Sequence, residues 1–479
     1  MKILLLIPPA SLDSSYGDLK DFSDPSPSIG LAYIAAVLRK GGFEVVATDA
    51  YVKQLDLVGI MKVLAEEKPN IIGISLLTTA ADIVVKIVEK IRKEFPQIKI
   101  VMGNMHASLF AEDLLKNNHA DYIIHREGEY TMLELTQALR DNKPMTGIKG
   151  LSYLDNNGRV VHNEQRPFIE NLDDLPFPAW DIFPLDDYKT DPRTEMAPGE
   201  KDLFIVASRG CPFVCAFCSS STDKSLGSKY RMRSPKNVVD EIEFLNKKYG
   251  TTVFIFLDLA FPLIKEHGMA LCQEIINRGL GNKIKWQTEL RVKPLDQEML
   301  DTMKKAGCHR VIFGIESGTD RILELCHKRF TTDDVRKAVK MAKRAGLEVD
   351  GMFMIGLPTE TVADIERTID FTVELNVRYA ILNIFVPYPG CEFHETLLRQ
   401  GKIKFKDWSD FTSYPTYTGG EPVYVPDDLT KKQLMALQTK AMKKFYLRPT
   451  FIFSELKRFK FSKIKMYWNG LKTLISVKR

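Results

Sequence analysis

The chain has 479 residues, of which 44% are hydrophobic and 27% are charged, a balance that is ordinary for a soluble globular protein. No apolar run approaches the roughly 18 residues that a membrane-spanning helix needs, so the sequence predicts no such helix. The formal net charge of +5 is unevenly distributed, because residues 431–479 carry 14 Lys and Arg against one acid. A mildly acidic body therefore precedes a basic tail.

The first residues, MKILLLIPPA, contain an apolar run that is too short for the core of a secretory signal. We therefore expect the protein in the reducing cytoplasm. Clustered cysteines there bind metals or take part in catalysis more often than they form disulfides. The length indicates about three domains.

Residues 1–141 alternate short apolar runs with helical patterns. Apolar strands separated by helices predict an α/β fold with a doubly wound, Rossmann-like parallel sheet that is covered on both faces. Helices are expected at residues 28–42, 57–67, 81–95, 109–116 and 130–140. Ligands of such sheets bind beyond the carboxyl ends of the strands.

The rest of the chain divides into three further segments. Residues 142–199 are expected to form a connector with a β-hairpin around Asn157 and Gly158. Residues 200–400 contain six strand–helix units, which predict a partial (β/α)6, TIM-like barrel with its chemistry at the carboxyl ends of the strands. Residues 401–479 are expected to form a basic helical region.

Three of the seven cysteines, Cys211, Cys215 and Cys218, lie within eight positions after the first strand of the barrel. A disulfide framework, a zinc site and a metal cluster with one open position are the three explanations to weigh. A structural zinc site takes four ligands, and the nearest histidines, His162 and His267, lie far away in the sequence. Three thiolates instead suit a four-iron cluster in which one iron stays free for a small molecule.

The spacing Cys-x3-Cys-x2-Cys, with Phe217 before the last cysteine, resembles the cluster motif of the radical S-adenosylmethionine (SAM) superfamily. Matching motifs follow along the barrel: GIESG at 314–318, MIGLPTET at 354–361 and PYPG at 387–390. The second-strand motif FLDLAF keeps Asp258 but has Leu259 where a second acid is common. The resemblance implies that the three cysteines hold a [4Fe–4S] cluster. The implied SAM contacts are Phe217, Asp258, Glu289, Arg291 and Glu316.

The N-terminal sheet resembles the cobalamin-binding domain of one branch of this superfamily. Ser75 and Leu77 form a Ser-x-Leu motif, and Gly103 begins a Gly-Gly motif in which Asn104 replaces the second glycine. The motif that supplies a histidine as lower cobalt ligand is absent, so the resemblance implies cobalamin held without histidine ligation. The implied cobalamin contacts are Ser75, Leu77, Thr78, Gly103, Asn104 and His106. For His106, a packed side chain is the alternative to cobalt ligation.

Two further features of the sequence each have more than one interpretation. The REGE stretch, residues 126–129, is frequent in this branch and either makes a contact or places acids at a helix start, where the helix dipole favours them. The tail interleaves eight aromatics with Lys and Arg between Phe445 and Trp468. This pattern predicts helices that pack on the barrel or a segment that lies on an anionic membrane surface. No nucleic-acid partner is expected, because no recognised nucleic-acid fold accompanies the tail.

The resemblance implies an oxygen-sensitive enzyme that cleaves SAM reductively and, with cobalamin, methylates an unactivated carbon of an apolar or lipid-like substrate. A flavodoxin or ferredoxin would supply the electron, and the tail would allow peripheral contact with the inner face of the membrane. The alternative is a cobalamin-independent radical SAM enzyme that catalyses cyclisation, rearrangement or coupling. A remote alternative is a zinc-stabilised binding protein.

Replacing any one of Cys211, Cys215 and Cys218 with Ala should abolish the cleavage of SAM to 5′-deoxyadenosine, because three thiolates must anchor three irons. The same change at the other four cysteines should be tolerated far better, since isolated thiols more often pack than ligate. Those four are Cys272, Cys308, Cys326 and Cys391. The measurement is 5′-deoxyadenosine formed by anaerobically reconstituted protein, and undiminished cleavage by the Cys215→Ala protein would contradict the cluster assignment.

Overall fold

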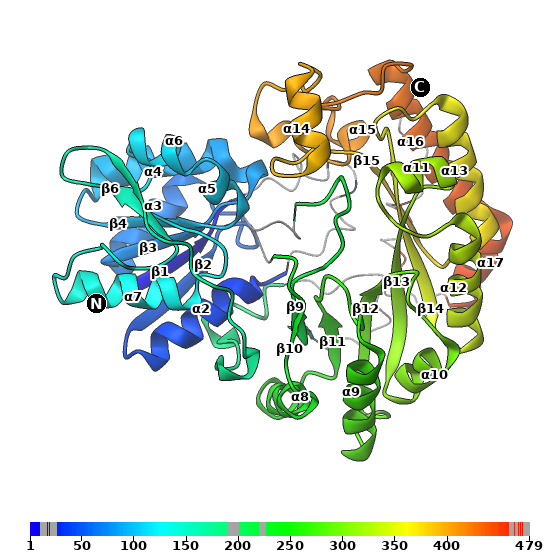
Figure 1. Ribbon diagram of the computed structural model, residues 1–479, viewed down its shortest axis with the longest axis horizontal. Helices are drawn as coiled ribbons and strands as arrows, with labels where there is room; N and C mark the ends of the chain where they lie inside the picture. Colours follow the sequence, from blue (N-terminus) through cyan, green and yellow to red (C-terminus); the bar gives the residue numbers. More distant parts are fainter. Residues whose placement is uncertain are drawn as a thin grey trace.

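The computed structural model describes residues 1–9, 26–188, 201–219 and 227–458, with the single positions 17, 19, 464, 468, 470 and 472. Figure 1 shows an N-terminal α/β body on one side and a curved strand–helix barrel on the other. The segment around helix α14 (Glu392–Arg399) lies along the top edge of that view, between the two bodies.

The N-terminal sheet has seven strands in the order β2-β1-β3-β4-β5-β6-β7. Their bounds are β1 (Lys2–Ile7), β2 (Glu44–Asp49), β3 (Ile71–Ser75), β4 (Lys99–Gly103), β5 (Tyr122–Ile124), β6 (Leu151–Leu154) and β7 (Val160–His162). The first five strands run parallel, as the sequence predicts for a doubly wound sheet. Strand β6 pairs antiparallel with β5, and β7 pairs antiparallel with β6 at the edge of the sheet.

Strands β6 and β7 form the hairpin that the sequence predicts around Asn157 and Gly158. The Asp155 carboxylate accepts hydrogen bonds from the backbone N–H groups of Asn157 and Arg159, and Gly158 has φ +74°. The hairpin extends the N-terminal sheet by pairing with β5, so the expected connector begins with two strands of that sheet.

Helices cover both faces of the N-terminal sheet. They are α2 (Ile29–Lys40), α3 (Leu57–Glu67), α4 (Ala81–Glu94), α5 (Met105–Leu109), α6 (Ala111–Lys116) and α7 (Glu129–Arg140). Helices α2 and α7 share a core with the barrel, whereas α3, α4, α5 and α6 bury the opposite face. The helix expected over residues 109–116 is confirmed as α6, which begins at Ala111 because Phe110 leaves helical geometry (φ −111°, ψ 30°). The short helix α5 before it was not expected.

The barrel consists of six parallel strands in the order β15-β14-β13-β12-β11-β8, which confirms the predicted partial (β/α)6 arrangement. The strands are β8 (Asp202–Ile205), β11 (Val253–Phe256), β12 (Lys285–Leu290), β13 (Cys308–Glu316), β14 (Glu348–Ile355) and β15 (Ala380–Ile384). The helices between and after them are α8 (Pro235–Tyr249), α9 (Lys265–Asn277), α10 (Gln297–Lys305), α11 (Asp320–Leu325), α12 (Thr332–Arg344), α13 (Val362–Leu375) and α14.

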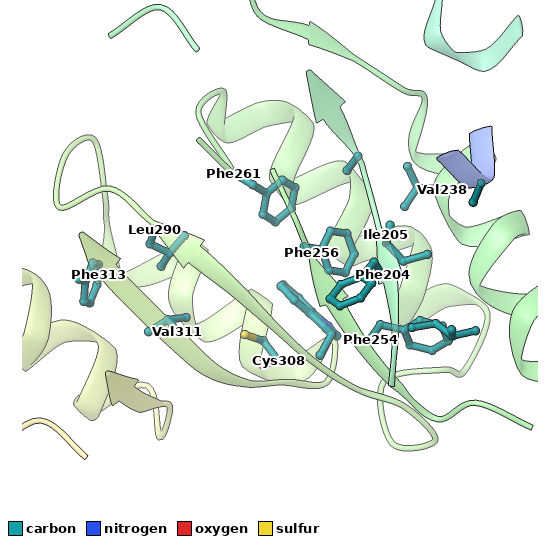
Figure 2. Close-up of a cluster of buried hydrophobic side chains, with 14 of the residues drawn as sticks. Phe204, Ile205, Val238, Phe254, Phe256, Phe261, Leu290, Cys308, Val311 and Phe313 are labelled. Atoms are coloured by element: carbon teal, nitrogen blue, oxygen red, sulfur yellow. The ribbon is translucent and has the colours of Figure 1, made fainter. Parts of the chain in front are cut away.

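Aromatic side chains fill the core beneath the first barrel strands. Figure 2 shows Phe204 on β8 beside Phe254 and Phe256 on β11. The Phe256 ring lies 5.0 Å from the ring of Trp286, whose indole N–H donates to the Ala306 carbonyl at 2.8 Å. Because its polar atom is satisfied, Trp286 can be fully buried here.

The C-terminal region touches both bodies. It contains η5 (Trp408–Asp410), α15 (Pro415–Thr418), α16 (Lys431–Tyr446) and α17 (Pro449–Lys457). Helix α16 packs on α13 and β15 and buries Phe445 completely. It contains only the first two residues of the 445–468 stretch, and residues 459–479 lie mostly outside the described residues, so the interpretations of that stretch stay predictions. Trp408 packs against His106 and Phe110 of the N-terminal body, and its backbone N–H donates to Asp82 at 2.6 Å. Among the helices that the structure describes, none has the length and apolar character needed to cross a bilayer.

Candidate active site between the two sheets

The cysteine loop follows β9 (Ser208–Arg209), just beyond the carboxyl end of β8. Strand β9 pairs antiparallel with β10 (Arg231–Met232), and Gly210 then turns the chain with φ +87°. A Cβ on Gly210 would lie 2.1 Å from the Lys229 carbonyl oxygen, so glycine is required there. The turn from the strand pair into the cysteine loop therefore depends on Gly210.

The three motif thiols differ from the other four cysteines in their accessibility. Cys211, Cys215 and Cys218 are partly exposed, whereas Cys272, Cys308, Cys326 and Cys391 are buried. Burial raises the pKa of the Cys211 thiol, and the nearby Cys218 and Cys215 thiols raise it further. In the described part of the chain, no three Cys, His, Asp or Glu side chains lie close enough together to hold a metal ion, so the fit of these thiols to an iron–sulfur cluster rests on their spacing and their accessibility.

Arg291 brings a positive charge to this loop. Its Nη1 lies 3.8 Å from Cys215 Sγ, its guanidinium stacks 3.4 Å from the Phe213 ring centroid, and its Nη2 donates to the Lys328 carbonyl at 2.7 Å. The Arg291 charge opposes the rise in the pKa of Cys211. Arg291 is therefore placed to stabilise thiolates, and its role as a SAM contact stays a prediction.

An irregularity in β13 places the Glu316 side chain beside the cysteine loop. The β13–β14 register shifts between Gly314 and Glu316, and Glu316 has φ +72°. Such a bulge redirects a side chain out of the regular strand alternation. The Glu316 carboxylate pairs with Lys328 Nζ at 2.9 Å, and that ammonium also lies 5.6 Å from the Phe217 ring centroid.

Glu289 and Lys328 complete this polar group. Glu289 remains accessible to solvent, but partial desolvation by the surrounding protein raises its pKa, the Glu316 carboxylate raises it further, and Lys328 lowers it. Four of the predicted SAM contacts thus lie around the cysteine loop: Phe217, Glu289, Arg291 and Glu316. Lys328 was not expected, because it follows α11 in the stretch LCHKRF, which matches no motif, and its contacts depend on long-range folding.

Asp258, the fifth predicted SAM contact, is engaged by the protein itself. One carboxylate oxygen accepts the Ser208 hydroxyl and the other accepts the Ala207 backbone N–H at 3.1 Å. Burial raises its pKa to about 6. The structure gives Asp258 a role in holding the start of the cysteine loop, and a SAM contact stays a prediction.

A cavity of about 420 Å³ lies between the carboxyl edge of the N-terminal sheet and the barrel. Its wall runs from Ser75, Gly103 and Asn104 on the sheet to Ser208 and Arg209, which lead into the cysteine loop. A Cβ on Gly103 would meet Ile124 atoms only at 3.6 Å and beyond, so the bare backbone at Gly103 leaves space open to a ligand. These residues fit the edge of a cobalamin site.

Asn104 adopts a backbone conformation that normally belongs to glycine. Its φ is +80° and its ψ is 177°, a region that side-chain-bearing residues rarely enter. The side chain stabilises it, because Nδ2 donates to Ser75 Oγ at 3.1 Å and Oδ1 accepts the Met105 N–H at 2.7 Å. The Gly-Gly backbone turn is therefore kept although the second glycine is replaced.

The other three predicted cobalamin contacts do not line this cavity, although the structure describes all of them. Leu77 is exposed, and Thr78 lies with its Oγ1 3.3 Å from His106 Nδ1. The His106 side chain is 3% exposed, burial lowers its pKa to about 4, and its ring packs against Phe110 and Trp408. The structure supports the packed alternative for His106, and a cobalamin role for the three stays a prediction.

The REGE stretch joins the two bodies through buried charges. Both oxygens of Glu127 lie 2.9 Å from Arg231 Nη1, and Glu127 also accepts from Arg209 Nη1 at 3.0 Å. Glu129 accepts from Arg209 Nη2 at 2.7 Å. All four residues are at least nine-tenths buried. The stretch therefore contacts the two short strands that flank the cysteine loop, and Glu129 also stands at the start of α7, as the helix-start interpretation expects. A contact of this stretch with a cofactor stays a prediction.

Comparison with known proteins agrees with this geometry. The family model of the radical SAM superfamily matches residues 205–372, and that of the B12 binding domain matches residues 20–136. An uncharacterised methyltransferase of Pyrococcus horikoshii is 34% identical over 460 residues, which cover 95% of each chain. A loop with three cysteine thiols, next to a domain that matches the B12-binding model, defines the class of protein. It is a radical SAM enzyme with a B12-binding domain. The chain belongs to the cobalamin-dependent radical SAM methyltransferase family.

Other matches extend over most of the chain. The anaerobic magnesium-protoporphyrin IX monomethyl ester cyclase of Rubrivivax gelatinosus is 28% identical, covering 89% of this chain and 75% of its own. The structure of the radical SAM methyltransferase TsrM from Kitasatospora setae, with cobalamin and a [4Fe–4S] cluster bound, superposes with a TM-score of 0.69 at 17% identity. That match covers 94% of this chain and 89% of TsrM and shows a shared fold. Family membership excludes the zinc-stabilised binding protein and favours the cobalamin-dependent alternative over the cobalamin-independent one.

The cofactors of this family are a [4Fe–4S] cluster, SAM and cobalamin. When bound, the cluster supplies the electron that cleaves SAM, and cobalamin supplies the methyl group. The positions of the chain's own residues predict three tasks for them in this chemistry. Arg291 and Lys328 place positive charge beside thiols and carboxylates, Glu316 and Glu289 present acceptor oxygens, and the Glu127–Arg209–Arg231 network holds the cysteine loop against the N-terminal body.

Replacing Glu127 with Ala should lower the free energy of unfolding by about 3–5 kcal/mol, because two buried guanidinium groups lose a shared carboxylate. The control is Glu134→Ala, which removes an ion pair between Arg166 and a half-exposed carboxylate and should cost less than about 1 kcal/mol. Denaturant unfolding of the cofactor-free protein measures both changes. Equal losses in the two variants would show that the buried network does not hold the two bodies together.

Proposed function

We propose that this protein methylates an unactivated carbon of a small, apolar or lipid-like molecule bound between the cavity and the open end of the barrel. The observation that carries the proposal is the continuous wall from Ser75, Gly103 and Asn104 to Ser208 and Arg209. This wall runs from the expected cobalamin edge to the two residues that precede Gly210 and the cysteine loop. A flavodoxin- or ferredoxin-type protein in the cytoplasm supplies the electron.

Apolar side chains on this wall support the choice of substrate class. Leu257 and Leu259, which follow β11, line the cavity and are 44% and 37% exposed. Val214 in the cysteine loop is 53% exposed. Large apolar side chains left open beside a reaction site favour an apolar ligand. Leu259 stands where relatives commonly carry an acid, so this part of the wall is apolar in this chain.

Replacing Gly103 with Val should prevent cobalamin binding while leaving the fold intact, because the new side chain enters the cavity and meets little protein. Anaerobically reconstituted wild type should retain about one cobalt per chain together with iron, and the variant should retain iron and lose at least about nine-tenths of the cobalt. Metal analysis and the corrinoid absorbance measure this. The melting temperature of the cofactor-free variant is the folding control.

Formation of S-adenosylhomocysteine together with 5′-deoxyadenosine from SAM would support methyl transfer, and 5′-deoxyadenosine alone with a cyclised or coupled product would contradict it. Wild-type cobalt content in a folded Gly103→Val protein would contradict the proposed cobalamin edge instead. The two outcomes are separate, since the first concerns the reaction and the second the binding site.

Membrane contact, if the tail provides it, involves helix α17. Ile452, Phe453 and Leu456 on this helix are 43%, 65% and 62% exposed, and no residue of α17 is buried. The basic residues of the tail would add roughly 1 kcal/mol each near an anionic surface. Helix α17 lies near the amino ends of the barrel strands, where it lines a cavity with Lys285, the first residue of β12.

The position of α17 separates membrane contact from substrate delivery. Strand β12 is six residues long, so the amino and carboxyl ends of the barrel lie about 20 Å apart. A membrane against α17 would face the end of the barrel opposite the cysteine loop. A lipid-like substrate would therefore have to reach the site by a separate route, and peripheral contact is not an argument for a lipid substrate.

The double variant Phe453→Ser/Leu456→Ser should reduce binding to phosphatidylglycerol vesicles at least about tenfold, because two exposed apolar side chains lose their insertion energy. Co-sedimentation at low and high salt measures it, with Val58→Ser on the exposed side of α3 as the control. Point changes are preferable to truncation after Lys444, which would remove the fully buried Phe445. Wild-type sedimentation of the double variant would contradict membrane contact through α17.

A further inference from the structure

A second cavity, of about 590 Å³, opens at the amino ends of the barrel strands. Val253, Lys285 and Glu348, which begin β11, β12 and β14, contribute to its wall. Thr450 and Ser454 of α17 form another part of the wall. The cysteine loop lies at the carboxyl ends of the strands, so this cavity belongs to the opposite end of the barrel and is not part of the site described above.

The wall of this cavity is strongly cationic. Its basic residues are Lys285, Lys304, Lys343, Arg378, Arg448 and Arg458, and its acidic residue is Glu348. The Glu348 carboxylate is already shared between Arg378 at 3.1 Å, Arg310 at 3.7 Å and Arg458. Arg378 also lies 3.8 Å from the Glu455 carboxylate. The described residues place no carboxylate within ion-pair distance of the four remaining wall cations, Lys285, Lys304, Lys343 and Arg448.

Arg448 is the most deeply buried of these four cations, and its guanidinium lies 3.6 Å from the Phe445 ring centroid. It is 8% exposed, yet its guanidinium makes no ion pair with a carboxylate among the described residues. It donates to the carbonyl oxygens of Phe445 at 2.7 Å and Val377 at 2.8 Å, and its buried Nε has no acceptor. Burial lowers the pKa of Arg448 to about 10. Burying a cation without a neighbouring anion costs free energy. We therefore expect an anionic ligand to bind beside Arg448.

Lys343 adds an ammonium beside the Arg448 guanidinium. Its Nζ donates to the carbonyl oxygens of Leu375 at 2.8 Å and Asn376 at 2.7 Å, and no acid contacts it among the described residues. Burial lowers the pKa of Lys343, and the Arg448 charge lowers it further. The two cations therefore repel each other across the wall, and an anion between them would relieve the repulsion.

We propose that this cavity is an anion-binding site that takes a phosphate-bearing ligand. Guanidinium and ammonium groups together match phosphate oxygens, and Arg in particular recognises them with parallel N–H donors. The volume accommodates a small phosphorylated molecule or the headgroup of an anionic lipid at the edge of α17. This proposal stands on the cavity alone and is independent of the reaction proposed above.

The test is titration of the full-length protein with inorganic phosphate and with pyrophosphate, followed by calorimetry and phosphorus NMR line width. The double variant Lys285→Gln/Lys304→Gln removes two exposed wall charges, so it avoids the helix contacts that an Arg448 variant would disturb. Wild type should bind saturably, and the double variant at least about tenfold more weakly. The control Lys337→Gln/Lys340→Gln changes two exposed lysines of α12 outside the wall and should bind as wild type does.

Vesicles then identify the source of the phosphate. Competition of phosphatidylglycerol vesicles, but not phosphatidylcholine vesicles, with pyrophosphate would assign the site to a lipid headgroup. Pyrophosphate binding that neither phosphatidylglycerol nor phosphatidylcholine vesicles weaken would assign the site to a soluble ligand. The Phe453→Ser/Leu456→Ser protein should keep its pyrophosphate affinity, which separates this site from membrane insertion. The proposal is overturned if the wild type binds neither phosphate nor pyrophosphate. It is also overturned if the Lys285→Gln/Lys304→Gln protein and the Lys337→Gln/Lys340→Gln control bind these anions with equal affinity.

Discussion

The arrangement of this protein depends on one requirement, that the charges buried between its two bodies must be paired. Arg209 and Arg231 flank the cysteine loop, and Glu127 and Glu129 at the start of α7 neutralise them. A buried guanidinium without its carboxylate costs several kcal/mol, so the network tolerates few other placements of the two sheets. Glu127, Glu129 and Arg209 also line the cavity beside the Ser75–Gly103 edge, so the contact that holds the bodies together forms part of the cavity wall.

Within the site, each of two cationic side chains lies next to groups that are negative when ionised. Arg291 stands beside Cys215, and Lys328 bridges Glu316 and the face of Phe217. Three thiols in one loop and two carboxylates nearby would repel one another without these cations. The arrangement suits a site that must hold an iron–sulfur cluster and a charged sulfonium cofactor together. Both cations come from the barrel, as do the groups they face.

The two ends of the barrel have different characters. The carboxyl ends carry the cysteine loop and the apolar wall of Leu257 and Leu259, whereas the amino ends carry the cationic cavity around Arg448. The C-terminal region touches both the barrel and the N-terminal body, since α16 packs on β15 and Trp408 packs on His106. A basic tail therefore has a structural task in addition to any contact outside the molecule.

The sequence by itself determined what depends on short-range spacing. The strand and helix alternation, the cysteine spacing and the Ser75–Gly103 motif are local patterns, and the backbone of Asn104 keeps the glycine turn that the motif implies. Local patterns failed where a side chain's environment comes from distant residues. The Arg209–Glu127 pair spans 82 positions and the contact of Trp408 with the N-terminal body spans 326 positions, so no window of sequence contains both partners.

The tertiary structure alone decided the role of Lys328, the packed state of His106 and the cationic character of the barrel's amino end. Each depends on burial, which changes the energy of a charge or ring nitrogen by removing water and is not a property of the residue type. His106 shows this most clearly. Three positions after a cobalamin-type motif it resembles a ligand, but Thr78, Phe110 and Trp408 surround its ring in the folded chain.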